Sequence, residues 1–198
     1  MNRQEYDILQ NIYLNQFENQ RILAKQSGHS LGIVNRSLKS LTIQGYIDEQ
    51  IQPTNKTIRE LREKSPKNAI ILAAGFGMRM VPINTQYPKA LIEVDGQPII
   101  ERIINQLNSI GVKDIYIVVG YMKEQFEYLI DEYKVKLIVN EKYAEKNNLH
   151  SLRLAADYLS NTYIIPCDIW CDKNPFHRYE LYSWYMVSDL VTDESNVR

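Results

Sequence analysis

The sequence lacks any long apolar stretch. No hydrophobic run of the kind found in a signal peptide follows Met1, and no run approaches the roughly 20 apolar residues that a helix needs to cross a bilayer. Hydrophobic residues make up 44% of the chain and charged residues 24%, which is the composition of a globular protein that folds in water. We therefore expect a cytoplasmic protein with no membrane partner.

Cysteine is scarce as well. The chain has two cysteines, Cys167 and Cys171, in a Cys-x-x-x-Cys spacing. No second pair of cysteine or histidine residues completes the ligand set of a zinc site. We expect two free thiols beside the end of a strand.

One string of small residues stands out. Residues 69–79 read Ala-Ile-Ile-Leu-Ala-Ala-Gly-Phe-Gly-Met-Arg. An apolar run that breaks into glycines predicts a buried strand that leads into a loop whose backbone N–H groups can approach an anion. Arg79 and Lys89 add two positive charges near this loop, so we expect a phosphate site. An ordinary glycine turn after a strand is the alternative.

Two common glycine motifs do not account for this string. A dinucleotide fingerprint needs a third glycine where Met80 stands, and a P-loop needs Gly-Lys-Ser or Gly-Lys-Thr. The full pattern is Leu-Ala-Ala-Gly-x-Gly-x-Arg, then Pro82, then Pro-Lys-Ala-Leu at 88–91. It resembles the signature of the nucleotidyltransferases that join an NTP to a phosphorylated small molecule, the sugar-phosphate and choline-phosphate family.

The resemblance implies roles for individual residues. In that family the loop cradles the NTP phosphates, the arginine contacts them, and the lysine steadies the transition state. It therefore implies that Arg79 and Lys89 are catalytic here. The nucleotide-binding residues that it implies are Leu72, Ala73, Ala74, Gly75, Phe76, Gly77, Arg79, Lys89, Gly120, Tyr121, Asn148 and Ser151.

Strands and helices alternate from about residue 67 onward. The expected strands are the apolar run that begins at Ala69 and residues 91–94, 114–119, 136–139 and 162–167, and the expected helices are at 98–110, 123–133 and 149–159. Strands separated by helices predict an α/β fold with a Rossmann-like, mostly parallel sheet that is covered on both faces. Ligands of such sheets bind at the carboxyl ends of the strands.

Candidate residues follow several of these strands. The resemblance places Gly120 and Tyr121 near the nucleotide base, although a turn with a core tyrosine is equally open. Asn147, Asn148 and Ser151 match the Asn-Asn-x-x-Ser of the choline-phosphate branch, in which these side chains lie near the base and ribose. Asparagine also caps helices, so a capping role for Asn148 is the alternative.

Asp168 follows the last expected strand. Its position resembles that of the family's metal-binding aspartate, which holds Mg²⁺ against the α-phosphate. Mg²⁺ favours carboxylate and phosphate oxygens and keeps several waters, so one or two carboxylates suffice. We expect Mg²⁺ as the cofactor, with a turn-forming aspartate as the alternative.

These expectations combine into one reaction. A phosphomonoester oxygen of the acceptor attacks the α-phosphorus of an NTP in line and releases pyrophosphate, and the asparagine motif favours CTP. Alignment and charge neutralisation by Arg79, Lys89 and Mg²⁺ would supply the catalysis, without a protein nucleophile. The alternative is a DNA-binding transcriptional regulator that uses a nucleotidyltransferase-like domain as a nucleotide or metabolite sensor.

Phosphocholine is the candidate acceptor. A quaternary ammonium group binds between aromatic rings, and the second half of the chain is rich in them. These rings can equally belong to the core. They are Tyr121, Trp170, Tyr179, Tyr182, Trp184 and Tyr185.

The polar, proline-containing segment Glu63–Asn68 predicts a boundary between a first domain of residues 1–66 and a nucleotidyltransferase domain of residues 67–198. Residues 1–67 carry ten Lys and Arg against seven Asp and Glu, whereas the rest carries thirteen against seventeen. The N-terminal 67 residues therefore carry a net positive charge, and the remaining residues a net negative charge.

The first domain resembles a winged helix-turn-helix. Its expected elements are helices at 4–17, 20–27 and 31–41, a strand at 45–51 and a polar helix that ends near Lys64. The third helix would place Asn35, Arg36, Lys39 and Ser40 against duplex DNA. A module for docking or for forming a homodimer is the alternative.

The end of the sequence departs from the family pattern. Family members continue well beyond the metal-binding aspartate and add strands and a second carboxylate, so the resemblance covers their nucleotide-binding half. We expect these 198 residues to bind Mg²⁺ with an NTP and to release pyrophosphate slowly or not at all. Faster turnover would mean that another carboxylate, such as Asp172 or Asp189, completes the metal site.

Overall fold

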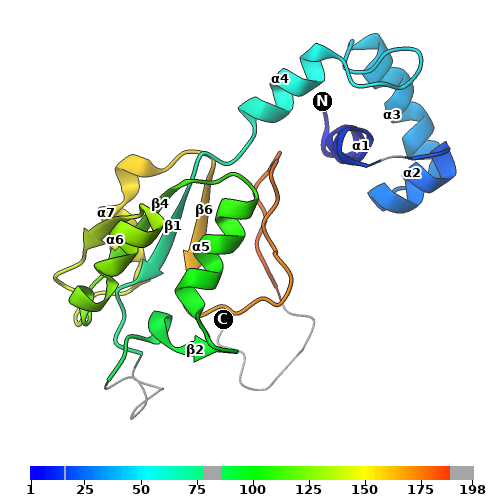
Figure 1. Ribbon diagram of the computed structural model, residues 1–198. Coiled ribbons are helices and arrows are strands. Elements are labelled where there is room, and N and C mark those ends of the chain that lie inside the picture. The colour runs from blue at the N-terminus through cyan, green and yellow to red at the C-terminus, as the bar shows by residue number, and fades with distance from the viewer. Residues whose placement is uncertain (16, 78–85, 188–198) are drawn as a thin grey trace. The chain divides into compact units, whose positions relative to one another are not determined.

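The computed structural model describes residues 1–15, 17–77 and 86–187 (Figure 1). Its residues divide into two compact units, Met1–Leu61 with Glu180–Arg198, and Arg62–Tyr179. The first is described as far as Val187. No helix within the described ranges is long and apolar enough to cross a membrane.

A sheet of four parallel strands forms the centre of the larger unit. The strands are β1 (Asn68–Ala73), β4 (Asp114–Val119), β5 (Lys136–Val139) and β6 (Thr162–Pro166). Their order is β5-β4-β1-β6, so β1 is hydrogen-bonded on both sides. Every residue of β1 is buried, as expected of an apolar run in a parallel sheet. The predicted α/β class with a parallel sheet is confirmed.

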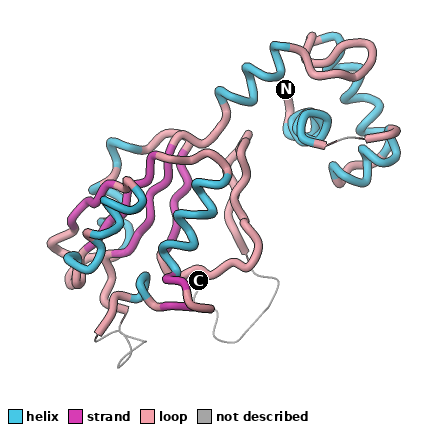
Figure 2. The backbone as a smooth tube through the Cα atoms, in the orientation of Figure 1, coloured by secondary structure: helices cyan, strands magenta, loops and turns pink. Residues whose placement is uncertain are grey.

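Helices cover both faces of this sheet (Figures 1 and 2). One face packs against α5 (Ile99–Ser109), η4 (Lys123–Phe126) and α6 (Tyr128–Tyr133). The other face meets α7 (Asn148–Leu154) and η5 (Ala156–Tyr158). Alternate strand residues point to opposite faces, and Ile71 and Leu72 accordingly belong to different cores. The single helix predicted at 149–159 is divided in two.

The described segment before α5, residues 86–98, contains little regular structure. It holds η3 (Lys89–Leu91), followed by β2 (Glu93–Val94) and β3 (Gln97–Pro98), which pair antiparallel. The turn between the two strands takes positive φ at Asp95 (51°) and Gly96 (75°). The strand predicted at 91–94 is therefore only two residues long, and Lys89 begins the one-turn helix before it.

The described part of the smaller unit consists mostly of α1 (Arg3–Leu14), α2 (Gln20–Ser27), α3 (Leu31–Ile43) and α4 (Asn55–Glu63), and α4 crosses into the larger unit after Leu61. Apolar residues from the first three helices, such as Leu9, Leu23 and Val34, are fully buried in the core of the smaller unit. Asn2 caps α1 in a capping box with Glu5.

The strand predicted at 45–51 is not formed. The structure has a single antiparallel bridge there, between Ile47 and Pro53. The Asp48 carboxylate accepts hydrogen bonds from the N–H groups of Gln50 (2.9 Å) and Gln52 (2.8 Å), which closes a tight loop. Ile51 adopts a φ of 60°, outside the extended region. Local side-chain bonding thus replaces the expected extended segment.

The Glu101 carboxylate of α5 accepts hydrogen bonds from two tyrosines of α6. The hydroxyl groups of Tyr128 and Tyr133 donate to the two oxygens of Glu101, at 2.7 and 2.8 Å. Burial, followed by the neighbouring carboxylate, raises the pKa of Tyr133 to about 12 and raises that of Tyr128 as well. Both phenols are therefore neutral donors near neutral pH.

We expect Glu101→Ala to lower the free energy of unfolding by about 1–3 kcal/mol, because two partly buried hydroxyl groups lose their acceptor. Urea denaturation measures the change. Glu93→Ala, which removes an exposed carboxylate of the same unit, serves as the control and should change stability by less than about 0.5 kcal/mol. Equal stability of the two variants would contradict the prediction.

Candidate functional site

The carboxyl ends of three strands meet at one edge of the sheet. Directly after β1, the Ala74 carbonyl accepts from the N–H of Tyr121, which follows β4, at 3.2 Å. The Leu72 carbonyl accepts from the N–H of Cys167, which follows β6, also at 3.2 Å. The three loops therefore begin side by side, at the edge where α/β sheets bind ligands.

The glycine loop leaves β1 at this edge. Ala74 is buried, Gly75 is exposed, and Gly77 takes a φ of 71°, a left-handed conformation that favours glycine. The Phe76 ring lies edge-on to the Tyr121 ring, with centroids 4.5 Å apart. Arg79 and Pro82, which the sequence also singled out, lie outside the described residues.

Two predicted site residues form an ion pair. Lys89 Nζ lies 2.6 Å from Asp168 Oδ2, although the two residues are 79 positions apart. Lys89 comes from η3 and Asp168 from the turn after β6. Their side chains are 27% and 38% exposed, so both charges can reach a ligand from solvent. The structure thus brings the predicted cation and the predicted metal ligand to one point.

Asp168 fits Mg²⁺ as a single protein ligand. Its carboxylate is partly exposed at the binding edge and is of the donor type that Mg²⁺ favours. Among the residues described, no cluster of three or more His, Cys, Asp or Glu side chains could hold a metal ion. A Mg²⁺ ion here would therefore need further oxygens from nucleotide phosphates and water. Asp172 is 95% exposed beside Arg102, and Asp189 lies outside the described residues.

The thiol beside this pair is poorly suited to act as a nucleophile. Burial raises the pKa of Cys167 to about 12, and the negative charge of Asp168 adds to the shift. The thiolate is the reactive form of cysteine, so Cys167 is almost wholly unreactive at neutral pH. Cys167 and Cys171 are both free, as expected.

The two predicted residues of α7 take different positions. Ser151 is 2% exposed, and its hydroxyl accepts a hydrogen bond from Asn140 Nδ2 at 3.0 Å. Asn148 is exposed and is already the first residue of the helix. The cap is Asn147, whose extended backbone lets its side chain accept from the N–H of Leu149 at 3.1 Å. A capping role for Asn148 was therefore wrong, whereas the nucleotide contacts of Asn148 and Ser151 stay predictions.

The six aromatic residues considered for a quaternary ammonium cage are divided between the two units. The Arg102 guanidinium lies 4.3 Å from the Trp170 ring centroid, and Tyr179 is buried. Tyr182 belongs to the smaller unit, where its hydroxyl donates to Asp7 at 2.7 Å. Trp184 and Tyr185 also belong to that unit. Tyr121 lies beside the glycine loop.

Sequence reasoning missed one aromatic residue at this edge. Tyr143 lies in the turn region after β5, and its ring centroid is 6.3 Å from that of Tyr121. No motif marks it, because its neighbour Gly120 is 23 positions earlier in the chain. Only the fold brings the two together.

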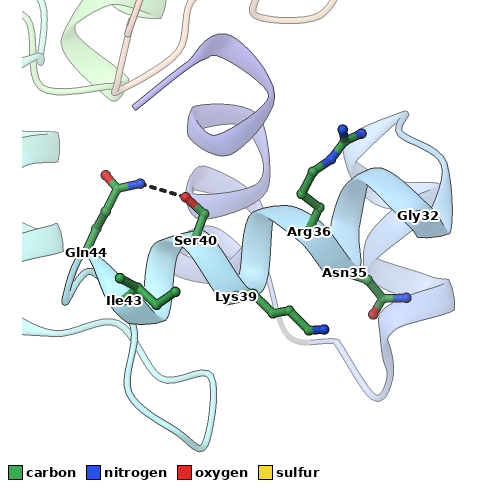
Figure 3. Close-up of a pocket in the computed structure, with 7 residues that line it drawn as sticks. All are labelled: Gly32, Asn35, Arg36, Lys39, Ser40, Ile43 and Gln44. Atoms are coloured by element: carbon green, nitrogen blue, oxygen red, sulfur yellow. Dashed lines mark hydrogen bonds between the residues drawn. The ribbon is translucent and has the colours of Figure 1, made fainter.

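The predicted DNA-contacting residues share the outer surface of α3 (Figure 3). Asn35, Arg36 and Lys39 are exposed, and the Ser40 hydroxyl accepts from Gln44 Nε2 at 2.8 Å. Together with Gly32, Ile43 and Gln44 they line one open hollow. Asn35, Arg36 and Lys39 therefore face outward as expected, whereas Ser40 is half-buried and its hydroxyl also bonds to the buried Glu5.

Comparison with known proteins gives consistent matches to the larger unit. A family model described as the MobA-like NTP transferase domain matches residues 69–179. The choline-phosphate cytidylyltransferase of Streptococcus pneumoniae (strain ATCC BAA-255 / R6) is 49% identical over 108 residues, which are 54% of this chain and 47% of the relative. The 2-aminoethylphosphonate cytidylyltransferase of Lancefieldella rimae is 50% identical over 105 residues, 52% of this chain and 43% of the relative.

A solved structure agrees with these matches. The CTP:phosphocholine cytidylyltransferase of Streptococcus pneumoniae superposes with a TM-score of 0.56 at 47% identity, covering 57% of this chain and 50% of the other. The chain spans about half the length of the curated relatives that it matches.

We expect Asn147→Ala to lower the free energy of unfolding by about 1 kcal/mol, because α7 loses its N-cap, and Asn148→Ala to change it much less. The pair is matched, since both variants remove an asparagine side chain from adjacent exposed positions. Urea denaturation without nucleotide gives the comparison. An equal or larger effect of Asn148→Ala would show that the cap is assigned to the wrong residue.

Proposed function

The chain belongs to the MobA-like NTP transferase family, and from this premise we propose that it transfers CMP from CTP to a phosphorylated small molecule and releases pyrophosphate. The observation that carries the proposal is the Lys89–Asp168 ion pair beside the glycine loop. The cytidylyltransferase relatives favour CTP. Their names point to acceptors that join a nitrogen-containing group to a phosphate or phosphonate, and phosphocholine is such a molecule.

The reaction needs alignment and charge more than it needs a reactive side chain. An oxygen of the acceptor phosphate forms a bond to the α-phosphorus, and the bond from that phosphorus to the oxygen bridging to the β-phosphate breaks. The electron pair leaves with pyrophosphate, which carries the added negative charge. Lys89 would stabilise that charge, as would Arg79.

The proposed nucleotide contacts lie along the carboxyl edge of the sheet. Backbone N–H groups of Ala74, Gly75 and Gly77 would face the phosphates, because the loop presents few side chains there. Residues near the base and ribose would be Phe76, Gly120, Tyr121, Asn148 and Ser151. Leu72 and Ala73 would support the loop from β1.

Asp168 would hold Mg²⁺ together with the nucleotide. Bound there, the ion would neutralise phosphate charge. In the structure Lys89 already places a positive group against the same carboxylate. The Asp168 side chain is therefore directed to a point where a cation is favoured.

We expect Lys89→Ala to weaken CTP binding about tenfold to a hundredfold, because a charge-assisted contact to phosphate is lost. Isothermal titration with CTP, UTP, GTP, ATP and dTTP in the presence of Mg²⁺ measures both affinity and base preference. Lys136→Ala is the matched control, since Lys136 forms an ion pair of the same length, 2.6 Å, with Asp114 at the amino ends of β4 and β5.

Lys136→Ala should leave CTP affinity within about twofold of the original. If the original chain binds none of the five nucleotides, the transferase proposal fails and a sensor of another metabolite is favoured. Equal affinity of Lys89→Ala and the original chain would remove Lys89 from the site.

A second candidate function belongs to the smaller unit, for which we propose binding of duplex DNA through a winged-helix-like arrangement. The supporting observation is that Asn35, Arg36 and Lys39 are exposed on α3. Arg36 and Lys39 would contact phosphates, and Asn35 and Ser40 would reach base edges. Formation of a homodimer by this unit is the alternative.

We expect the full chain to retard duplex DNA in a gel, with affinity that falls steeply as salt rises. Arg36→Ala and Lys39→Ala should each weaken binding and lower the slope of log affinity against log salt by about one. Lys25→Ala, an exposed lysine on α2, is the control and should change neither. Absence of retardation at low salt would rule out DNA and leave dimerisation, which sedimentation tests.

A further inference from the structure

The chain turns directly after β5 at a buried asparagine. Asn140 is 1% exposed, and its N–H donates to the Val119 carbonyl at 2.8 Å, which extends the pairing of β5 with β4. Its Nδ2 donates to Ser151 Oγ at 3.0 Å, and its Oδ1 accepts from the N–H of Lys142 at 2.9 Å. A buried side chain whose donor and acceptor are both engaged is held in one position. The turn that presents Tyr143 is therefore rigid.

Tyr143 occupies the space that a side chain at Gly120 would need. A Cβ added to Gly120 would lie 2.6 Å from Tyr143 Cβ, 2.8 Å from its Cγ and 2.9 Å from the Ala74 carbonyl oxygen. All three distances are shorter than the 3.0 Å that real Cβ atoms keep from other atoms. Gly120 is thus enclosed between Tyr143 and the first residue of the glycine loop.

Aromatic contacts continue from Tyr143 to that loop. The ring of Tyr143 lies 6.3 Å from the Tyr121 ring, which in turn lies 4.5 Å from the Phe76 ring at an angle of 77°. Both separations are within the range in which aromatic rings attract one another. Tyr121 and Phe76 are proposed nucleotide contacts, whereas Tyr143 is half-buried and packs against the core under α7.

We infer that Tyr143 is a positioning residue of the nucleotide site: it holds Gly120 and the Tyr121–Phe76 pair in the arrangement that receives the nucleotide. The inference rests on the proposed function of that site. Removal of the ring leaves space into which Tyr121 and the glycine loop can move. The apparent dissociation constant equals the intrinsic constant divided by the fraction of molecules in the competent arrangement. A fall of that fraction to about one tenth therefore weakens binding about tenfold.

The buried pair of Asn140 and Ser151 has an indirect role in the same arrangement. Ser151 accepts from Asn140, and Asn140 fixes the turn before Tyr143. Ser151 can thus affect nucleotide binding through Tyr143 without touching the nucleotide. This role requires only the contacts that the structure contains.

The test is isothermal titration of the full chain with CTP in the presence of Mg²⁺. Tyr143→Ala should raise the dissociation constant about tenfold, and Tyr143→Leu, which fills the space beside Gly120 without a ring, should raise it several-fold. Tyr143→Phe should stay within about twofold, because the ring makes the contacts to Gly120 and Tyr121.

Tyr158→Ala is the matched control for a purely structural effect. The Tyr158 ring stacks on Tyr116 of β4 at 4.0 Å, on the same face of the sheet but away from its carboxyl edge. This variant should lose stability, measured as its melting temperature without nucleotide, while its CTP affinity stays within about twofold. The contrast separates positioning of the site from general destabilisation.

Each remaining outcome has a distinct meaning. If the original chain binds no nucleotide, the proposed function is wrong. If it binds CTP and Tyr143→Ala binds equally well, the inference about Tyr143 is wrong and the proposed function stands. Equal weakening by Tyr143→Ala and Tyr158→Ala would also overturn the inference, because the effect would then follow from stability alone.

Discussion

The buried strand β1 is the constraint on which the rest of the larger unit depends. Its six residues, Asn68–Ala73, are hydrogen-bonded to β4 on one side and to β6 on the other. Because all three strands are parallel, the chain leaves them at the same edge, and the loops that begin at residues 74, 120 and 167 start next to one another. The glycine loop, the aromatic pair and the Lys89–Asp168 ion pair gather at that edge for this reason.

The ion pair contributes more to recognition than to stability. Exposed ion pairs stabilise a fold by about 0–1 kcal/mol, because water screens the charges and ordering two side chains costs entropy. Lys89 and Asp168 are both partly exposed, so a phosphate or a cation can compete for either partner at small cost. Asn140 and Tyr143 differ, since Asn140 is buried and Tyr143 is half-buried against Gly120, so that together they fix the turn after β5. The carboxyl edge thus combines an ion pair after β6, whose partners can be exchanged, with a fixed turn after β5 at its other end.

Sequence patterns predicted the sheet well, because each strand is an apolar run bounded by polar or small residues. β4 and β5 match their predicted ranges, β6 ends one residue earlier, and β1 begins one residue before the predicted apolar run. The rule that ligands bind at the carboxyl ends of strands also led to Asp168. Features that depend on competing local bonds were missed: Asp48 closes a loop where a strand was expected, and Asn147 takes the cap considered for Asn148. Tyr143 was missed because its contact with Gly120 exists only in the folded chain.

The central claim is that nucleotide binds at the carboxyl edge of the sheet. Hydrogen exchange of the full chain, followed by mass spectrometry with and without CTP and Mg²⁺, tests it directly. The account predicts slower exchange in peptides covering residues 74–77, 86–92, 120–122 and 140–151, and in the turn at 167–168. It predicts no change at the amino ends of β4 and β5, around Asp114 and Lys136, or in α1–α3. Protection confined to those regions, with none at the carboxyl edge, would contradict the account.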